Sequence, residues 1–121
     1  MIRFALTFAI LAGAVDAQSV KLRGNEIDIL LSGNTAVGLW DGAPYRQFFD
    51  PDGSTIFAQP DARSARGEWR VEGDEYQSRW PGETEWKGWL VMEYAGDWYW
   101  VSKATPPTPF KIVDGEQLVS P

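Results

Sequence analysis

Residues 69–100 read WRVEGDEYQSRWPGETEWKGWLVMEYAGDWYW and hold six of the seven tryptophans in the chain. Apolar and polar residues alternate through much of this stretch, and turn residues interrupt it at Gly73-Asp74, Pro81-Gly82 and Ala95-Gly96-Asp97. Alternation with a period of two is typical of β-strands, because successive side chains point to opposite faces of a sheet. The stretch therefore predicts four short strands with an aromatic core or an aromatic binding face.

The residues before this stretch predict one short helix followed by more strands. Gly24–Leu31 has apolar side chains at helical spacing, with Asn25 as the expected N-cap and Gly33-Asn34 as the expected end. Residues 18–23 are expected to form a short lead, and residues 59–66 a polar loop. The strands predicted over the whole chain are 35–40, 45–49, 55–58, 68–72, 75–80, 86–94, 98–103 and 110–113.

About eight short strands joined by short loops predict a mainly β protein, built as a single small antiparallel meander. A twisted sheet of this size tends to curl, and closure removes its unpaired edges. We therefore expect a curled sheet or a closed barrel with the N-terminal helix over one open end. A β-sandwich is the alternative. Because the chain has no cysteine, aromatic packing has to supply the stability that disulfides give many small secreted domains.

The N-terminal segment has the features of a secretory signal peptide. Arg3 supplies a positive charge, residues 4–12 are an apolar run, and Val15 and Ala17 occupy the last positions before a signal-peptidase site. The run is shorter than the ~20 apolar residues that a transmembrane helix needs. We expect cleavage after Ala17, a single β-rich domain over residues 18–121, a periplasmic or secreted location, and no stable membrane insertion once the signal is removed.

Charge and composition weigh against several classes of function. The formal net charge is −6 and the basic residues are scattered, which disfavours nucleic acid because an acidic surface repels phosphates. The chain has neither histidine nor cysteine, so it lacks the commonest general base, the commonest metal ligand and a thiol nucleophile. We predict no cofactor, no metal site and no catalytic residue. The sequence leaves the oligomeric state open.

Several motifs resemble those of a family of small, secreted, uncharacterised alphaproteobacterial proteins. Residues 30–38, LLSGNTAVG, resemble the family's L-x-G-N-T-x-x-G opening, and residues 67–71, GEWRV, resemble its G-x-W-x-V strand. Residues 76–81, YQSRWP, and residues 86–89, WKGW, resemble its Y-C-S-x-W-P and W-x-C-Y hairpin. The resemblance covers roughly residues 22–118. It implies a secreted compartment and a fold, and it implies no activity.

The chain departs from that family at one pair of positions. The family usually carries a cysteine pair where this chain has Gln77 and Gly88. The two positions lie on the two predicted strands of one hairpin, about opposite each other, where a cross-strand disulfide is geometrically feasible. Both cysteines are absent here, so the constraint that a disulfide would place on the unfolded chain is absent too.

The predicted hairpin over residues 86–103 is apolar on both faces. Trp98 and Trp100 share one face of their strand, whereas Trp89 and Tyr94 take opposite faces of the other strand. One face has to enter the core. The other face either contacts the helix or the proline-rich loop, which requires no ligand, or forms an aromatic wall for one. On the second interpretation the ligand-binding residues are Trp40, Trp89, Tyr94, Trp98 and Trp100.

These observations predict a secreted or periplasmic, non-enzymatic binding module for a small apolar ligand or an envelope protein. One alternative is a small hydrolase with an acid pair, for which the chain offers Glu68, Asp74, Glu83, Glu85, Glu93 and Asp97. Another is an inhibitor or structural partner that pairs through a sheet edge. Two carboxylates converging in one cleft would favour the hydrolase, and a flat open edge strand would favour the inhibitor.

Overall fold

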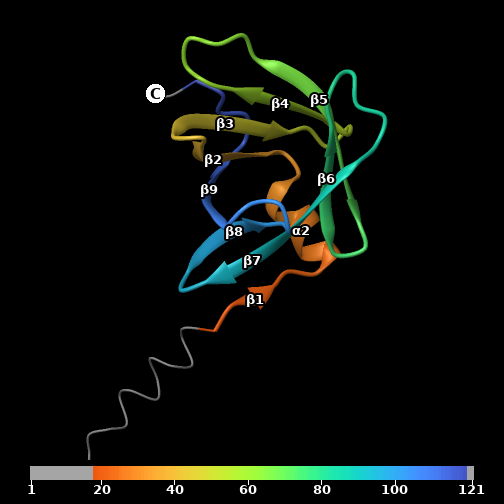
Figure 1. The fold of residues 1–121 in the computed structure, drawn as a ribbon, viewed down its shortest axis with the longest axis vertical. Coiled ribbons are helices and arrows are strands. Elements are labelled where there is room, and N and C mark those ends of the chain that lie inside the picture. The colour runs from red at the N-terminus through yellow and green to blue at the C-terminus, as the bar shows by residue number, and fades with distance from the viewer. Residues whose placement is uncertain (1–17, 120–121) are drawn as a thin grey trace, which may run out of the picture.

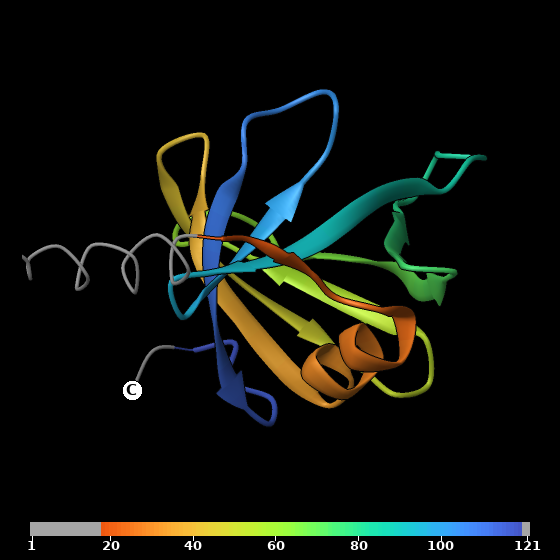
Figure 2. The same cartoon turned by 90° about the horizontal axis from the view of Figure 1, so that it is seen from below.

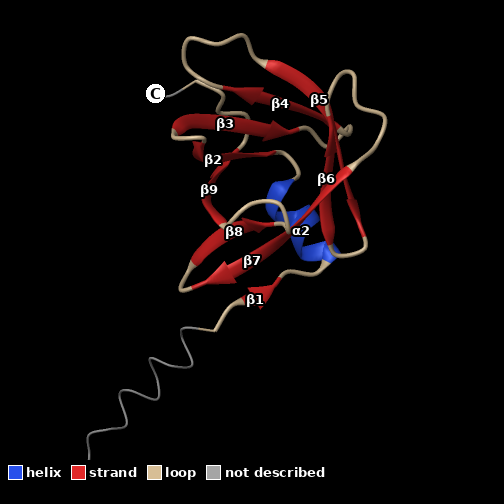
Figure 3. Ribbon diagram, in the orientation of Figure 1, coloured by secondary structure: helices blue, strands red, loops and turns tan. Residues whose placement is uncertain are grey.

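The computed structural model describes residues 18–119. The predicted signal peptide, residues 1–17, lies outside the described residues. The elements in chain order are β1 (Val20–Lys21), α2 (Gly24–Leu31), β2 (Asn34–Trp40), β3 (Ala43–Phe49), β4 (Ser54–Ala58), β5 (Ala65–Glu72), β6 (Glu75–Arg79), β7 (Lys87–Tyr94), β8 (Asp97–Val101) and β9 (Thr108–Asp114). Figures 1 and 3 show how α2 lies among these strands.

Strands β2 to β9 form a closed antiparallel barrel (Figure 1, Figure 2). Each strand pairs with the next one in the chain, and β9 pairs with β2 to close the ring. The predicted closed meander is therefore confirmed, and the β-sandwich alternative is wrong. A barrel of about eight strands has an interior just wide enough for its own side chains or for one small ligand.

Up-and-down connectivity places alternate connections at opposite ends of the barrel. We call the end that α2 covers the helix end and the other the open end. Connections at the helix end are residues 50–53, 73–74 and 95–96. Connections at the open end are residues 41–42, 59–64, 80–86 and 102–107.

Helix α2 has the predicted bounds and covers one end of the barrel, as expected. Ile27 and Leu31 are fully buried and belong to the barrel's hydrophobic core. The predicted N-cap, Asn25, is wrong. The N-cap is Arg23, which has an extended backbone and donates its N–H to the Glu26 carboxylate at 2.8 Å.

The turn between β5 and β6 explains why the N-cap is Arg23 and not the predicted Asn25. The Gly24 N–H donates to Asp74 Oδ1 at 2.8 Å, so a carboxylate from a distant turn satisfies the first helical donor. That hydrogen bond lowers the pKa of Asp74, and Lys21 at 3.5 Å adds to the effect. A Cβ at Gly24 would collide with the Gly73 carbonyl oxygen, which is why a glycine is needed there.

Strand β1 lies where a short lead was predicted. Val20 pairs with Glu93 and Lys21 pairs with Met92, so β1 runs along the second half of β7. Strand β6 pairs with the first half of β7. A strand of two residues is too short to show an alternating pattern in the sequence.

Every predicted strand is present, with ends that differ by a few residues. The largest difference is in β5, which begins at Ala65 inside the predicted polar loop. Ala65 and Arg66 have exposed side chains, yet their backbones pair with Phe57 and Ile56 of β4. Hydropathy does not show this because the pairing involves only the backbone.

The core at the helix end is aromatic. The fully buried Phe49 ring lies with its centroid 5.4 Å from Trp69, 5.6 Å from Tyr76 and 6.3 Å from Trp100. Trp69 Nε1 donates to the Asp50 carbonyl at 2.8 Å, so its polar atom is satisfied. Contacts of this kind contribute beyond the burial of area alone. The rings supply the packing that the absence of cysteine makes necessary.

Candidate functional site

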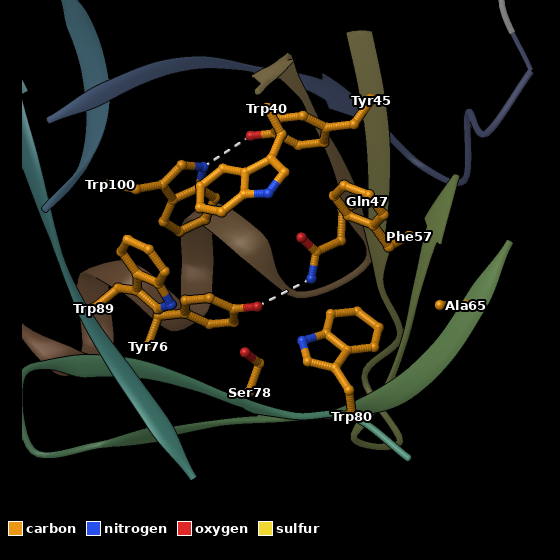
Figure 4. Close-up of a pocket in the computed structure, with 10 residues that line it drawn as sticks. All are labelled: Trp40, Tyr45, Gln47, Phe57, Ala65, Tyr76, Ser78, Trp80, Trp89 and Trp100. Carbon is orange, nitrogen blue, oxygen red and sulfur yellow. Dashed lines mark hydrogen bonds between the residues drawn. The ribbon is translucent and has the colours of Figure 1, made fainter. Parts of the chain in front are cut away.

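The open end of the barrel leads into a cavity of about 250 Å³ (Figure 4). Strands β2 to β8 or the loops beside them supply its walls, so residues distant in sequence converge on one space. The lining side chains are uncharged, and seven of the ten are aromatic: Trp40, Tyr45, Gln47, Phe57, Ala65, Tyr76, Ser78, Trp80, Trp89 and Trp100.

The cavity has a buried floor and a partly exposed rim. The floor residues are each less than one tenth exposed: Tyr45, Gln47, Tyr76, Ser78 and Trp100. The rim residues keep solvent-accessible surface: Trp40, Phe57, Ala65, Trp80 and Trp89. Polar atoms therefore concentrate at the floor, whereas the rim is almost entirely apolar. A few polar groups within a mostly apolar concave surface are typical of small-molecule sites.

Strand alternation directs the floor residues inward. Tyr45 and Gln47 lie two residues apart on β3, so both side chains point into the barrel. Tyr76 and Ser78 repeat this spacing on β6. Gly38 on β2 leaves room for the Tyr45 side chain, because a Cβ at Gly38 would lie 3.1 Å from the Tyr45 ring and hydroxyl.

Aromatic contacts, most of them between strands that are not neighbours in the sheet, hold the rim. Trp40 and Trp89 meet edge to face with ring centroids 6.0 Å apart. Phe57 stacks on Tyr45 at 5.2 Å and meets Trp80 edge to face at 6.2 Å. The Phe57–Tyr45 contact joins rim to floor, whereas the other two contacts join rim side chains to each other.

The loop that follows β6 fixes Trp80 on the rim. The Trp80 N–H donates to Glu83 Oε1 at 3.0 Å, and Lys87 Nζ lies 3.0 Å from Glu83 Oε2. The hydrogen bond from Trp80 lowers the pKa of Glu83, so this carboxylate stays charged and holds the loop. A Cβ at Gly67 would lie 2.6 Å from the Trp80 ring, so β5 needs a glycine where the indole crosses it.

Both floor tyrosines accept hydrogen bonds from other side chains. Trp100 Nε1 donates to the Tyr45 hydroxyl at 2.9 Å. Gln47 Nε2 donates to the Tyr76 hydroxyl at 3.0 Å and to Thr55 Oγ1 at 3.0 Å. Within residues 18–119 Tyr45 donates no hydrogen bond to the protein, whereas the Tyr76 hydroxyl also has the Ser78 side chain as a hydrogen-bonding neighbour. Figure 4 shows the Trp100–Tyr45 and Gln47–Tyr76 hydrogen bonds. It also shows the Gln47 amide oxygen directed into the cavity.

Burial keeps the floor tyrosines protonated. It raises the pKa of Tyr76 to about 12, while the neighbouring Ser78 and Gln47 side chains act in the opposite direction. Burial also raises the pKa of Tyr45, against a smaller opposing effect of the Trp100 hydrogen bond. A neutral phenol is a hydrogen-bond donor, so the floor presents two hydroxyl protons over the whole physiological pH range.

Three of the five predicted ligand-binding residues line the cavity: Trp40, Trp89 and Trp100. Trp98 points inward but lies nearer the helix end, where its ring stacks on Phe110 at 6.4 Å. Two residues along a strand are about 7 Å apart, so Trp98 and Trp100 share a face but not a depth. Tyr94 lies on the outside of the barrel, 41% exposed.

Sequence reasoning missed seven lining residues: Tyr45, Gln47, Phe57, Ala65, Tyr76, Ser78 and Trp80. One signal was available in β3. Gln47 stands between Tyr45 and Phe49 at an inward position, and a polar residue at a core position needs hydrogen-bond partners. Gln47 is therefore the residue through which the sequence could have indicated a polar floor.

The acidic residues lie away from the cavity. Arg79 pairs with Glu68 at 2.9 Å, and Lys111 pairs with Asp97 at 3.5 Å. Glu68 and Glu83 share a shallow groove on the outside of the barrel, where both are engaged with basic side chains. The lowered pKa of Glu83 is the opposite of what a general acid needs.

The remaining candidate carboxylates also stay outside the cavity. Asp74 caps the helix, and Glu85 and Glu93 are exposed. Within residues 18–119 no three Asp or Glu side chains gather closely enough to hold a metal ion. The closed ring β2–β9 pairs every strand on both sides, so it offers no flat open edge of the kind an edge-pairing inhibitor would use.

No family model, curated protein or solved structure matches the chain. The helix within residues 18–119 is neither long enough nor apolar enough to cross a membrane. A proposal for function therefore has to rest on the chemistry of the cavity.

Proposed function

We propose that the protein is a secreted or periplasmic, non-enzymatic binding protein that holds a small ligand in the cavity at the open end of the barrel. One observation carries the proposal: an aromatic rim surrounds a buried floor of hydrogen-bonding groups. An apolar protein cavity of about 150 Å³ holds benzene. A space of about 250 Å³ therefore suits one substituted ring or a small fused pair.

The solvent exposure of the rim side chains supports the proposal that the cavity binds a ligand. Trp40, Trp80 and Trp89 keep part of their surface in contact with solvent at the mouth. Removing apolar surface from water is favourable by roughly 25 cal/mol per Å², so a molecule that covers these rings gains binding free energy. Side chains serving the core alone would be expected to close over the space, since interiors pack to crystal-like density.

The chemistry of the lining supports binding rather than catalysis. Its ionisable groups are Tyr45 and Tyr76, and burial keeps both neutral. A general base has to accept a proton near the operating pH, which a phenol with a raised pKa does poorly. The acidic residues that a hydrolase would need lie outside, in ion pairs or at turns.

A small molecule fits the site better than an envelope protein does. A cavity of about 250 Å³ admits no folded partner. A protein would have to use the outer face of the β7–β8 hairpin, where a shallow apolar groove is lined by Met92, Tyr94, Tyr99 and Val101. The location in the periplasm or outside the cell follows from the signal peptide predicted over residues 1–17.

Titration of ¹⁵N-labelled protein with small aromatic probes such as acetophenone tests the proposal. The indole N–H signals of Trp40, Trp80, Trp89 and Trp100 should shift and saturate. Trp98 at the helix end and Trp86, which lies outside against Arg70 and Arg79, serve as internal controls. Shifts confined to the controls, or no shift with any probe, would contradict the proposal.

A plugged variant gives a second readout. Ala65→Trp places a large side chain on the rim and should weaken probe binding at least tenfold. Ala62→Trp, in the exposed loop between β4 and β5, is the matched control and should bind as the parent protein does. Equal loss in both variants would count against the cavity as the binding site.

A further inference from the structure

We propose that the ligand is an uncharged molecule with a flat apolar body and an acceptor oxygen, and that this oxygen receives a hydrogen bond from the Tyr45 or the Tyr76 hydroxyl. This inference rests on the proposed function and names the ligand class of the same site. It follows from the directions of the hydrogen bonds in the floor. These directions can be assigned because some of the groups can only donate and others can only accept.

The direction at Tyr45 is set by Trp100. An indole N–H can donate a hydrogen bond and cannot accept one. The contact of 2.9 Å between Trp100 Nε1 and the Tyr45 hydroxyl therefore uses a lone pair of the tyrosine oxygen. The hydroxyl proton of Tyr45 remains available to a ligand.

The direction of the hydrogen bond at Tyr76 follows from a chain of hydrogen bonds that starts at a backbone carbonyl. The Thr55 hydroxyl donates its one proton to the Phe48 carbonyl at 2.8 Å. Thr55 Oγ1 must then accept from Gln47, which places the Gln47 NH₂ group on the side of Thr55. The same NH₂ group donates to the Tyr76 hydroxyl at 3.0 Å, so the Tyr76 proton is directed either to the neighbouring Ser78 hydroxyl or to a ligand.

The floor therefore offers a hydroxyl proton at Tyr45 that no side chain of the floor receives, and a second at Tyr76 beside Ser78. These protons point to a ligand that carries a carbonyl, ether or hydroxyl oxygen at its buried end. The amide oxygen of Gln47, directed into the cavity in Figure 4, adds one acceptor for a ligand that also has a donor. Leaving buried donors without partners is costly, so a ligand lacking the oxygen binds less well.

The absence of charge in the lining argues against an ionic ligand. None of the ten lining residues is charged, so a carboxylate or phosphate would lose its hydration without gaining an ion pair. The net charge of −6 opposes anions further. Aromatic walls can attract a quaternary ammonium group, but the hydroxyl protons present their positive ends to the space where it would sit.

Four probes of similar size separate these possibilities. Acetophenone carries a neutral acceptor, ethylbenzene has no polar group, benzoate is an anion and phenyltrimethylammonium is a cation. Titrations followed by the indole signals of Trp89 and Trp100 should show acetophenone binding about three- to tenfold tighter than ethylbenzene. Benzoate and the ammonium probe should bind more weakly than ethylbenzene.

Conservative variants assign the preference to the two hydroxyls. In at least one of Tyr45→Phe and Tyr76→Phe, the preference for acetophenone over ethylbenzene should fall toward one, while ethylbenzene affinity in both stays within about twofold. Tyr99→Phe, on the outer face of β8, is the matched control and should keep the full preference. A full preference in both floor variants would overturn the assignment.

A measurement on the parent protein keeps the inference testable if a variant fails to fold. The infrared carbonyl band of bound acetophenone should move to lower frequency than in hexane, as expected for a carbonyl that accepts hydrogen bonds. An unshifted band, equal affinities for acetophenone and ethylbenzene, or tightest binding of either ion would overturn the inference while leaving the cavity a ligand site. Failure of all four probes would overturn the proposed function itself.

Discussion

Trp100 Nε1 donates a hydrogen bond of 2.9 Å to the hydroxyl of Tyr45, a residue 55 positions earlier in the chain. The bond joins β8 to β3 across the barrel interior, although these strands are not neighbours in the sheet. It lies at the floor of the cavity, where the Trp100 ring also stacks on Phe110 at 3.9 Å. The floor is thus held by a side-chain hydrogen bond across the interior as well as by the backbone hydrogen bonds between neighbouring strands.

We predict that Trp100→Phe destabilises the protein by roughly 1–3 kcal/mol, because a ring remains but the donor to Tyr45 and part of the packing are lost. A double-mutant cycle with Tyr45→Phe should give a coupling of about 1 kcal/mol between the two side chains. Urea unfolding followed by tryptophan fluorescence measures both quantities. Strictly additive losses would show that the bond contributes nothing to stability.

The buried phenol of Tyr76 predicts a loss of stability in alkali. Its pKa of about 12 in the folded protein lies above the value of 10.0 for an unperturbed tyrosine. The stabilisation linked to its proton is therefore fully present below pH ~10 and is lost as the pH rises toward ~12, by roughly 3 kcal/mol. Burial of Tyr45 acts in the same direction.

Urea unfolding at pH 8, 10 and 11.5 measures this loss. Tyr76→Phe should lose less stability than the parent protein between pH 8 and pH 11.5, because the titrating group is gone. Using the variant as the reference removes the contributions of lysines, which titrate in the same range. Parallel losses in the two proteins would rule out the buried phenol as their source.

The structure predicts that a cross-strand disulfide can be introduced at Gln77 and Gly88. These residues are direct partners in the β6–β7 ladder. Directly opposed residues have Cα atoms about 4.5–5.5 Å apart, which a disulfide can bridge. The Glu75 carboxylate lies where a Cβ at Gly88 would be, and as the end of a flexible side chain it can move aside.

The variant carrying both Gln77→Cys and Gly88→Cys should form the bond in air and gain up to about 3 kcal/mol of stability over its reduced form. Thiol titration under denaturing conditions and unfolding with and without reductant measure the two effects. Gln77→Cys alone is the control. Two free thiols after oxidation would mean that the register of this hairpin is wrong.

Ala95 should be replaceable with a gain in stability. It has φ of 52° in the two-residue turn between β7 and β8, a left-handed conformation that disfavours a Cβ, and Gly96 follows with φ of 86°. Ala95→Asn creates the Asn-Gly pair that such hairpin turns favour and should add about 0.5–1 kcal/mol. The midpoint of thermal unfolding checks this, and a lower midpoint would contradict it.

Much of the fold could be predicted because it is encoded locally. The turn at Asp41-Gly42 and the helix Gly24–Leu31 are marked by residue types that suit their backbone conformations. The N-cap could not be predicted, because the Asp74 carboxylate that completes the first turn lies 50 residues from Gly24. Strand β1 has two residues and is defined only by its partner.

The site was harder to predict than the fold. Alternation shows that Trp98 and Trp100 share a face, but depth inside a barrel depends on the stagger between strands, which periodicity does not contain. The same limit applies to Tyr45 and Tyr76, which look like ordinary core residues until the register brings them to one floor. Gln47 was the local clue, as a polar side chain at an inward position.

A crystal structure of the protein bound to acetophenone is the most direct test of the central claim, that the open end of the barrel holds a ligand between aromatic walls and two hydroxyl donors. We predict density for the ring beside Trp40 and Trp89, with the carbonyl oxygen about 3 Å from the hydroxyl of Tyr45 or Tyr76. Aromatic side chains collapsed into the cavity, or the probe bound on the outer groove beside Tyr94 and Tyr99, would contradict the account.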